Sequence, residues 1–184
     1  MKAWLVFIDE SGILMAPLVR RSWSPCGETP VFRQRTRAHQ KVSMIAALCV
    51  PPTRDAVQLY FRLHPNANIN AEAVIGFLRV LSEQLAGPAV LVWDRLQAHR
   101  ARITQEFFTC HLQLHPHLLP PYAPELNPVE NVWSYLKMNP LANFAPLDLD
   151  TLVQTTRHHG RSLQRTHDLL RSLMAHTPLS LRIR

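Results

Sequence analysis

The sequence predicts an α/β fold built on a mixed sheet, antiparallel in its first half and parallel in its second. Unbroken apolar runs at residues 4–8 and 89–93 are typical of strands buried on both faces. Turn residues separate the early apolar segments, which favours antiparallel pairing. From residue 70 onward, helical and strand patterns alternate, as they do where helices connect parallel strands.

The first half of the chain carries the strand signals. Residues 4–8 predict a strand that ends in a turn at residues 9–12. Residues 13–37 contain three prolines, a glycine and five arginines, and we interpret them as short antiparallel strands and turns. Residues 41–50 predict a strand that the prolines at 51 and 52 stop, and residues 60–63 predict one more.

The second half predicts helices and two further strands. Asn70 is the expected N-cap of a helix that reaches Leu85, because its apolar positions keep a three- and four-residue spacing. A strand at 89–93 ends on Asp94, residues 99–113 look helical, and residues 117–119 predict a short strand. Residues 127–137 predict a helix, and residues 147–175 predict one or two more. We expect residues 1–184 to form a single domain.

The charge balance points to an anionic partner. The 184 residues include 20 Lys and Arg against 13 Asp and Glu, a net charge of +7, and nucleic acid is the commonest partner of such a surface. No apolar run approaches the roughly 20 residues that cross a bilayer. The three cysteines form no CxxC pair, so we expect a reducing, cytoplasmic location.

Three acidic residues stand where a site would form. Asp9 and Asp94 each end an apolar strand, and sites in open α/β sheets gather at strand ends. Glu130 lies in the first turn of a later helix, separated from Asp94 by the 35 residues 95–129. Carboxylate oxygens suit hard cations such as Mg²⁺ or Mn²⁺, and on a basic protein such a site suggests phosphodiester chemistry.

Each acid also has a structural interpretation. An aspartate at a strand end is common as a turn residue or an arginine partner. Glu10 adjoins Asp9 and faces the opposite side of a strand, so the pattern alone does not choose between them. Asn127, Pro128 and Glu130 also form a favourable helix start, in which the glutamate reaches back to the Asn127 amide.

Three sequence motifs carry a resemblance to a known family. Residues 7–12 read FIDESG, residues 91–100 read LVWDRLQAHR, and residues 119–137 read LPPYAPELNPVENVWSYLK. In order and spacing these resemble the three acid motifs of the DDE transposases of the insertion sequence 630 and mariner superfamily. The third motif is long and specific, and the resemblance covers about residues 4–140.

The resemblance implies a ribonuclease H-like fold, a mixed five-stranded sheet flanked by helices. It implies an enzyme that uses two divalent ions, Mg²⁺ or Mn²⁺, to hydrolyse DNA at transposon ends, after which the freed 3′ hydroxyl attacks target DNA. Matched by position, Asp9, Asp94 and Glu130 would be the catalytic metal ligands, with Asp9 taken rather than Glu10.

Other residues near the motifs are secondary candidates. His99 and Arg100 would position a phosphate or support the site, and a surface or helix-start pair is the alternative. Lys137 lies on the Glu130 face of the predicted helix, where it could contact DNA or stand in solvent. Arg95 occupies a position where many relatives carry asparagine. Four apolar residues form the opposite stripe and are interpreted as core: Val129, Val132, Trp133 and Leu136.

The resemblance also sets expectations about partners. Relatives carry an N-terminal helix-turn-helix region. We expect this chain to lack one, and therefore expect a separate helix-turn-helix product, a truncated copy or a domesticated core. A homodimer on DNA in the bacterial nucleoid is the expected working form. The alternatives are a nuclease or DNA-binding remnant without strand transfer, and a basic interaction domain without chemistry.

Overall fold

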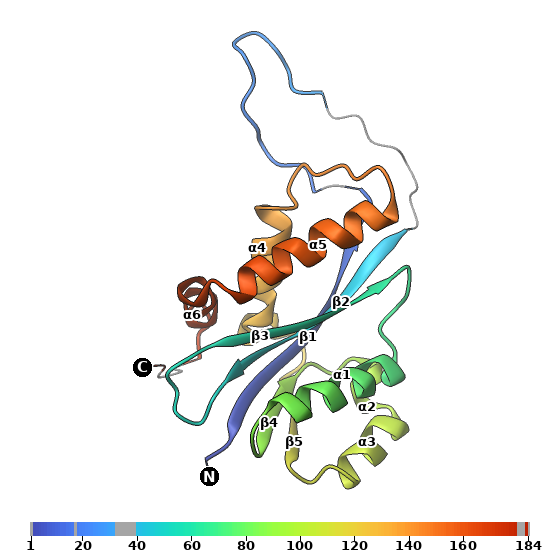
Figure 1. The fold of residues 1–184 in the computed structure, drawn as a ribbon, viewed down its shortest axis with the longest axis vertical. Coiled ribbons are helices and arrows are strands. Elements are labelled where there is room, and N and C mark those ends of the chain that lie inside the picture. Colours follow the sequence, from blue (N-terminus) through green and yellow to red (C-terminus); the bar gives the residue numbers. More distant parts are fainter. Residues whose placement is uncertain (1, 17, 32–39, 180–182, 184) are drawn as a thin grey trace.

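A five-stranded mixed sheet forms the centre of the computed structural model, which describes residues 2–16, 18–31, 40–179 and 183 (Figure 1). The strand order is β3-β2-β1-β4-β5. β1 pairs antiparallel with β2 and parallel with β4, so it joins the two halves of the sheet. The predicted mixed sheet is therefore confirmed. The strands are β1 (Trp4–Leu14), β2 (Lys41–Val50), β3 (Gln58–Pro65), β4 (Ala89–Trp93) and β5 (Leu114–Leu118).

Helices cover both faces of this sheet (Figure 1). One layer holds α1 (Ala71–Gln84), α2 (Gln97–Arg100) and α3 (Arg102–Thr109). The other holds α4 (Val129–Met138), α5 (Leu149–Gln164) and α6 (His167–Ala175), with a short 3₁₀ turn, η1 (Pro124–Leu126), before α4. Asn70 caps α1 as predicted, because its side-chain oxygen accepts a hydrogen bond from the Ala73 N–H at 3.0 Å.

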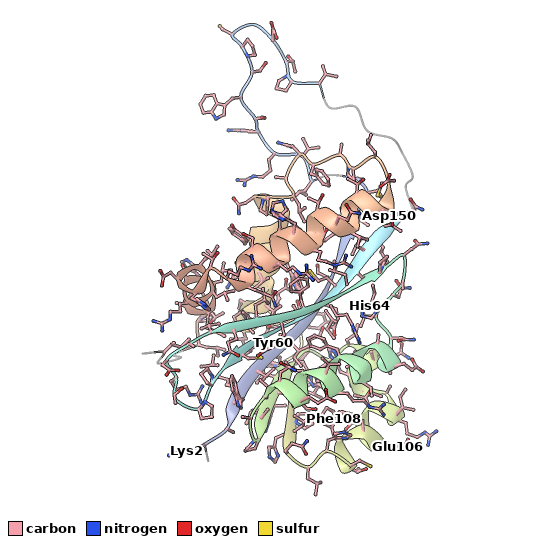
Figure 2. All side chains as sticks on the ribbon, viewed as in Figure 1. Lys2, Tyr60, His64, Glu106, Phe108 and Asp150 are labelled. Atoms are coloured by element: carbon pink, nitrogen blue, oxygen red, sulfur yellow. The ribbon has the colours of Figure 1, made fainter. Side chains whose placement is uncertain are left out.

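The core lies on both sides of the sheet because strand residues alternate between faces. On β1, Val6 and Ile8 pack with the α1 layer, whereas Phe7 and Ile13 pack with the α4 layer. Figure 2 shows side chains filling both spaces between sheet and helices. Neighbouring residues of β1 therefore face different helix layers. The side chains of Asp9 and Glu10 for this reason contact different helices.

The end of β1 was predicted wrongly. The sequence suggested a turn at residues 9–12, but β1 continues to Leu14 and pairs with β2 along the whole length, from Leu5 opposite Val50 to Leu14 opposite Lys41. Asp9 therefore lies inside a strand rather than at its end. Parallel pairing with β4 stops at Phe7, so Asp9 stands just past the end of that ladder.

Three other boundaries differ from the expectation. Residues 15–16 and 18–31 form no strand, and residues 32–37 of the expected strands lie outside the described residues. The expected helix at 99–113 is two shorter helices, α2 and α3, with Ala101 in extended backbone between them. β3 and β5 begin before the predicted residues. β3 is extended by its pairing with β2, and β5 by its pairing with β4, although the sequence pattern of each strand is weak.

Within the described part of the chain, no helix combines the length and apolar character needed to span a bilayer.

Candidate active site

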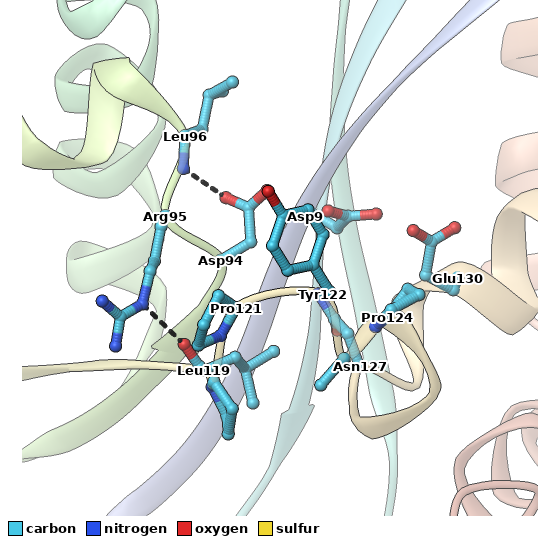
Figure 3. Close-up of a pocket in the computed structure, with 12 residues that line it drawn as sticks. Asp9, Asp94, Arg95, Leu96, Leu119, Pro121, Tyr122, Pro124, Asn127 and Glu130 are labelled. Carbon is cyan, nitrogen blue, oxygen red and sulfur yellow. Dashed lines mark hydrogen bonds between the residues drawn. The ribbon is translucent and has the colours of Figure 1, made fainter.

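Asp9, Asp94 and Glu130 line one open cavity of about 420 Å³ (Figure 3). They come from β1, from the residue that follows β4, and from the first turn of α4. The rest of the wall is Arg95, Leu96 and the segment after β5. The structure thus brings together the three acids that the sequence singled out.

Asp9 is buried and held by a tryptophan. Its side chain is only 7 % exposed, and the indole N–H of Trp133 donates a hydrogen bond to Asp9 Oδ2 at 2.6 Å. Burial and the neighbouring charge of Glu130 raise the pKa of Asp9 to about 7, against the lowering effect of the Trp133 hydrogen bond. Trp133 was predicted as core; it is buried, and it also orients this carboxylate.

Asn127 fixes the start of α4 against β1. Its side-chain N–H donates to the Ile8 carbonyl at 3.0 Å, and its side-chain oxygen accepts from the Val129 N–H at 3.2 Å. The Asn127 backbone N–H donates to the Pro124 carbonyl, not to Glu130. The expected reciprocal cap by Glu130 is therefore absent among the described residues, and this carboxylate faces the cavity (Figure 3).

Asp94 is held by a buried histidine. His99 has no exposed surface; its Nδ1 lies 2.9 Å from Asp94 Oδ1, and its Nε2 lies 3.0 Å from Glu10 Oε1. The ring stacks on Trp93 with centroids 4.1 Å apart. Burial acts to lower the pKa of His99, but the two carboxylates outweigh it and raise the pKa to about 9. The imidazolium therefore donates to both acids at neutral pH.

Neighbouring acids of β1 have different surroundings. Asp9 lines the cavity and accepts a hydrogen bond from Trp133 of α4, whereas Glu10 accepts one from His99 of α2. Glu10, Asp94 and His99 also bring their ligand atoms within 4.8 Å of one another. The direct hydrogen bonds through His99 link the two acids and hold Asp94 in place.

The remaining candidates lie around the cavity in different ways. Arg95 lines it, and its Nε–H donates to the Leu119 carbonyl at 3.2 Å (Figure 3). Arg100 is exposed on α2. Lys137 is half-buried, and its ammonium donates to the Ser11 hydroxyl at 2.6 Å. His99 is enclosed, which favours the supporting role over contact with a phosphate.

The charges of the three cavity acids are suited to a hard cation. The charge of Glu130 and the more weakly acting charge of Asp94 raise the pKa of Asp9, and burial raises the pKa of Glu130 despite the opposing charge of Lys137. The His99 hydrogen bond lowers the pKa of Asp94 and keeps it ionised. Three oxygen donors that repel one another at an open cavity fit Mg²⁺ or Mn²⁺.

The raised pKa values predict how stability depends on pH without metal. Asp9 binds its proton more tightly in the folded state, so the free energy of unfolding falls as pH rises from about 4 to 7. His99 also has a raised pKa, so its contribution is complete below about 6.5 and is lost as pH rises through about 9. We expect urea unfolding in EDTA to show a loss of roughly 5–6 kcal/mol from pH 5 to 9.

Two variants separate these contributions. Asp9→Asn should flatten the curve below pH 7, and His99→Gln should flatten it above pH 7. A wild-type stability that rises across this range would contradict both assignments.

Comparisons with known proteins place this chain in a family. A family model described as DDE superfamily endonuclease matches residues 4–153. The chain belongs to this family, the DDE superfamily endonucleases.

Solved structures give the same fold. The chain is similar to the Mos1 mariner transposase in a paired-end complex with Mn, with a TM-score of 0.63, 17 % identity, and coverage of 86 % of this chain and 48 % of that chain. The Mos1 catalytic domain matches with a TM-score of 0.55 and 15 % identity over 86 % of this chain and 70 % of that one. The fold is therefore the ribonuclease H-like fold of transposase catalytic domains, as predicted.

One curated protein shares a short segment. The uncharacterized protein y4pE/y4sA of Sinorhizobium fredii (strain NBRC 101917 / NGR234) is 54 % identical over 35 residues, 19 % of this chain and 26 % of that protein. The chain thus covers about half of the Mos1 chains in the paired-end complexes and about a quarter of this protein.

Proposed function

We propose that this chain is a transposase catalytic domain that cleaves DNA and transfers the resulting 3′ end to target DNA. The observation that carries the proposal is the convergence of three carboxylates, Asp9, Asp94 and Glu130, on one cavity of a basic chain. Family membership and a ribonuclease H-like fold support it. Mos1 structures described as a paired-end complex and a strand transfer complex support DNA as the partner.

In this proposal the three acids hold two divalent ions. Mg²⁺ or Mn²⁺ bound there would activate the attacking oxygen and stabilise the leaving 3′ oxygen. Structures of Mos1 with Mn and with Mg support these two cations. The protein's own contribution is to fix the donors beforehand: Trp133 orients Asp9, His99 orients Asp94, and the start of α4 positions Glu130.

DNA would enter over the exposed side of the cavity. Arg95 and Tyr122 stand at its wall (Figure 3), and Tyr122 is fully exposed. Arg100 and Lys137 are the nearby cations proposed to contact the backbone. A homodimer on DNA, with one subunit for each transposon end, and a separate helix-turn-helix partner belong to the same proposal.

Thermal stability with Mn²⁺ tests the metal site directly. Saturating Mn²⁺ should raise the melting temperature of the wild-type chain by about 5–10 °C, because binding to the native state alone stabilises it by about 3 kcal/mol at a hundredfold excess over Kd. Asp94→Asn should remove the increase, and the exposed neighbour Arg100→Ala should retain it. The increase should also be smaller at pH 6 than at pH 8, because Asp9 must lose a proton to bind.

Equal stabilisation of the wild-type and Asp94→Asn chains would place the metal elsewhere. A joining assay with a pre-cut 3′ end then separates the alternatives: strand transfer supports the transposase, and hydrolysis alone supports a nuclease.

A further inference from the structure

Three exposed arginines form a line along α5 and its C-cap residue, Arg165. Arg157, Arg161 and Arg165 follow one another at four-residue intervals, which places successive positions about 6 Å apart along the helix axis. All three are exposed, and with four polar neighbours they line a shallow hollow of about 500 Å³. The neighbours are Gln154, His158, Ser162 and Thr166. We call these seven residues the arginine surface.

The positive charge of the arginine surface is not neutralised within the described part of the chain. No carboxylate there lies within ion-pair distance of these arginines, and their guanidinium groups donate no hydrogen bond to any residue that the structure describes. Arg102, by contrast, pairs with Glu106 at 2.7 Å. The acid on α5 itself is Asp150 in its first turn (Figure 2), two turns before Arg157.

The three arginines do not take part in the packing of α5 against the sheet. The inward face of α5 packs against β3, where Gly160 leaves room for the Phe61 ring: a Cβ there would stand 2.6 Å from a ring carbon. The arginine surface shares no residue with the buried positions of α5, and its three arginines are exposed.

We infer that the arginine surface binds the phosphate backbone of a DNA segment outside the one that reacts at the acids. Guanidinium groups form bidentate hydrogen bonds with phosphate oxygens. Three arginines in a row can therefore contact successive phosphates along one DNA strand. The surface shares no lining residue with the acid cavity. Such contacts fix position rather than read sequence. The inference rests on the proposed function in one respect, which is that DNA is the polyanion that this surface binds.

The salt dependence of DNA binding tests this surface. The probe is a labelled 40-base-pair duplex in EDTA, so that the acids and metal play no part. Each neutralised phosphate contributes about −0.9 to the slope of log K against log salt, so Arg157→Gln/Arg161→Gln/Arg165→Gln should make the slope shallower by about 2.7. Between 50 and 200 mM salt, the wild-type chain should therefore lose about 40-fold more affinity than this variant.

A matched variant controls for net charge. Lys2→Gln/Arg79→Gln/Arg102→Gln also removes three exposed positive charges, at positions away from α5. It should leave the slope within about 1 of wild type. Both triple variants should melt within about 2 °C of the wild-type chain, because exposed substitutions change stability little.

Equal slopes for the wild-type chain and the α5 variant would overturn the inference. An equal change of slope in both triple variants, or a wild-type chain that does not bind the duplex, would overturn it as well. Failure of the proposed function would look different. A chain with the expected slopes but no metal-dependent cleavage would retain the arginine surface and lose the catalytic assignment.

Discussion

Replacing Asp94 by asparagine should reduce metal-dependent DNA cleavage by at least about 10³-fold. The change removes one negative oxygen from the three acids that line the cavity, and metal stabilisation of the transition state is worth several kcal/mol. Asparagine keeps the size of the side chain and the acceptor for the Leu96 N–H, which lies 2.9 Å from Asp94 Oδ1. The fold should survive, with circular dichroism unchanged.

Glu10→Gln is the matched control for this prediction. Glu10 neighbours Asp9 but lies on the opposite side of β1 and bonds to His99. Cleavage by Glu10→Gln should fall much less, because the cavity acids all remain. An equal loss from Glu10→Gln and Asp94→Asn, measured by single-turnover cleavage in Mn²⁺, would contradict the choice of Asp9 as the ligand.

Removing His99 should have the largest effect on stability. His99→Ala leaves Glu10 without its partner, with only 11 % of its side chain exposed, and also removes the stacking on Trp93. We expect a loss of about 3 kcal/mol, because breaking a buried ion pair strands the remaining charge. The melting temperature at pH 7 should fall by roughly 6–12 °C.

The control for His99 is its exposed neighbour on α2. Arg100→Ala should change the melting temperature by less than about 2 °C. In His99→Ala, cleavage should also fall, because Asp94 loses the imidazolium that orients it. Unchanged stability of His99→Ala would show that the Glu10–His99–Asp94 bridge does not hold this part of the fold together.

Much of the fold is predictable because local pattern and tertiary pairing agree. The bounds of β2 and β4 match the apolar runs, and Asn70 caps α1 at the expected residue. The end of β1 is not predictable in this way. The strand continues through Asp9, Glu10 and Ser11 because ten backbone pairs with β2 hold it, and this pairing leaves no local signal.

The candidate site shows the same limit. Spacing and motif indicated the three acids, and His99 as a residue that supports the site, but they did not indicate the role of Trp133. Trp133 belongs to the apolar stripe of α4, so periodicity assigns it to the core. A buried indole N–H needs a hydrogen-bond acceptor, and this was the one sequence clue to its contact with Asp9. The Glu10–His99 contact joins residues 89 positions apart, and only the fold reveals it.

The path of β1 divides the cavity into walls of unequal local stability. Asp9 sits inside β1, where it and both of its chain neighbours pair with β2, Asp9 opposite Ala46. The Ile8 carbonyl also accepts a hydrogen bond from the Asn127 side chain. Such backbone opens to hydrogen exchange only when the sheet itself unfolds. The segment from Pro120 to Tyr122 is exposed and lies outside any helix or strand, so it opens at much lower free energy. In the proposed function, DNA would therefore be accommodated from the loop side, while Asp9 would keep its position.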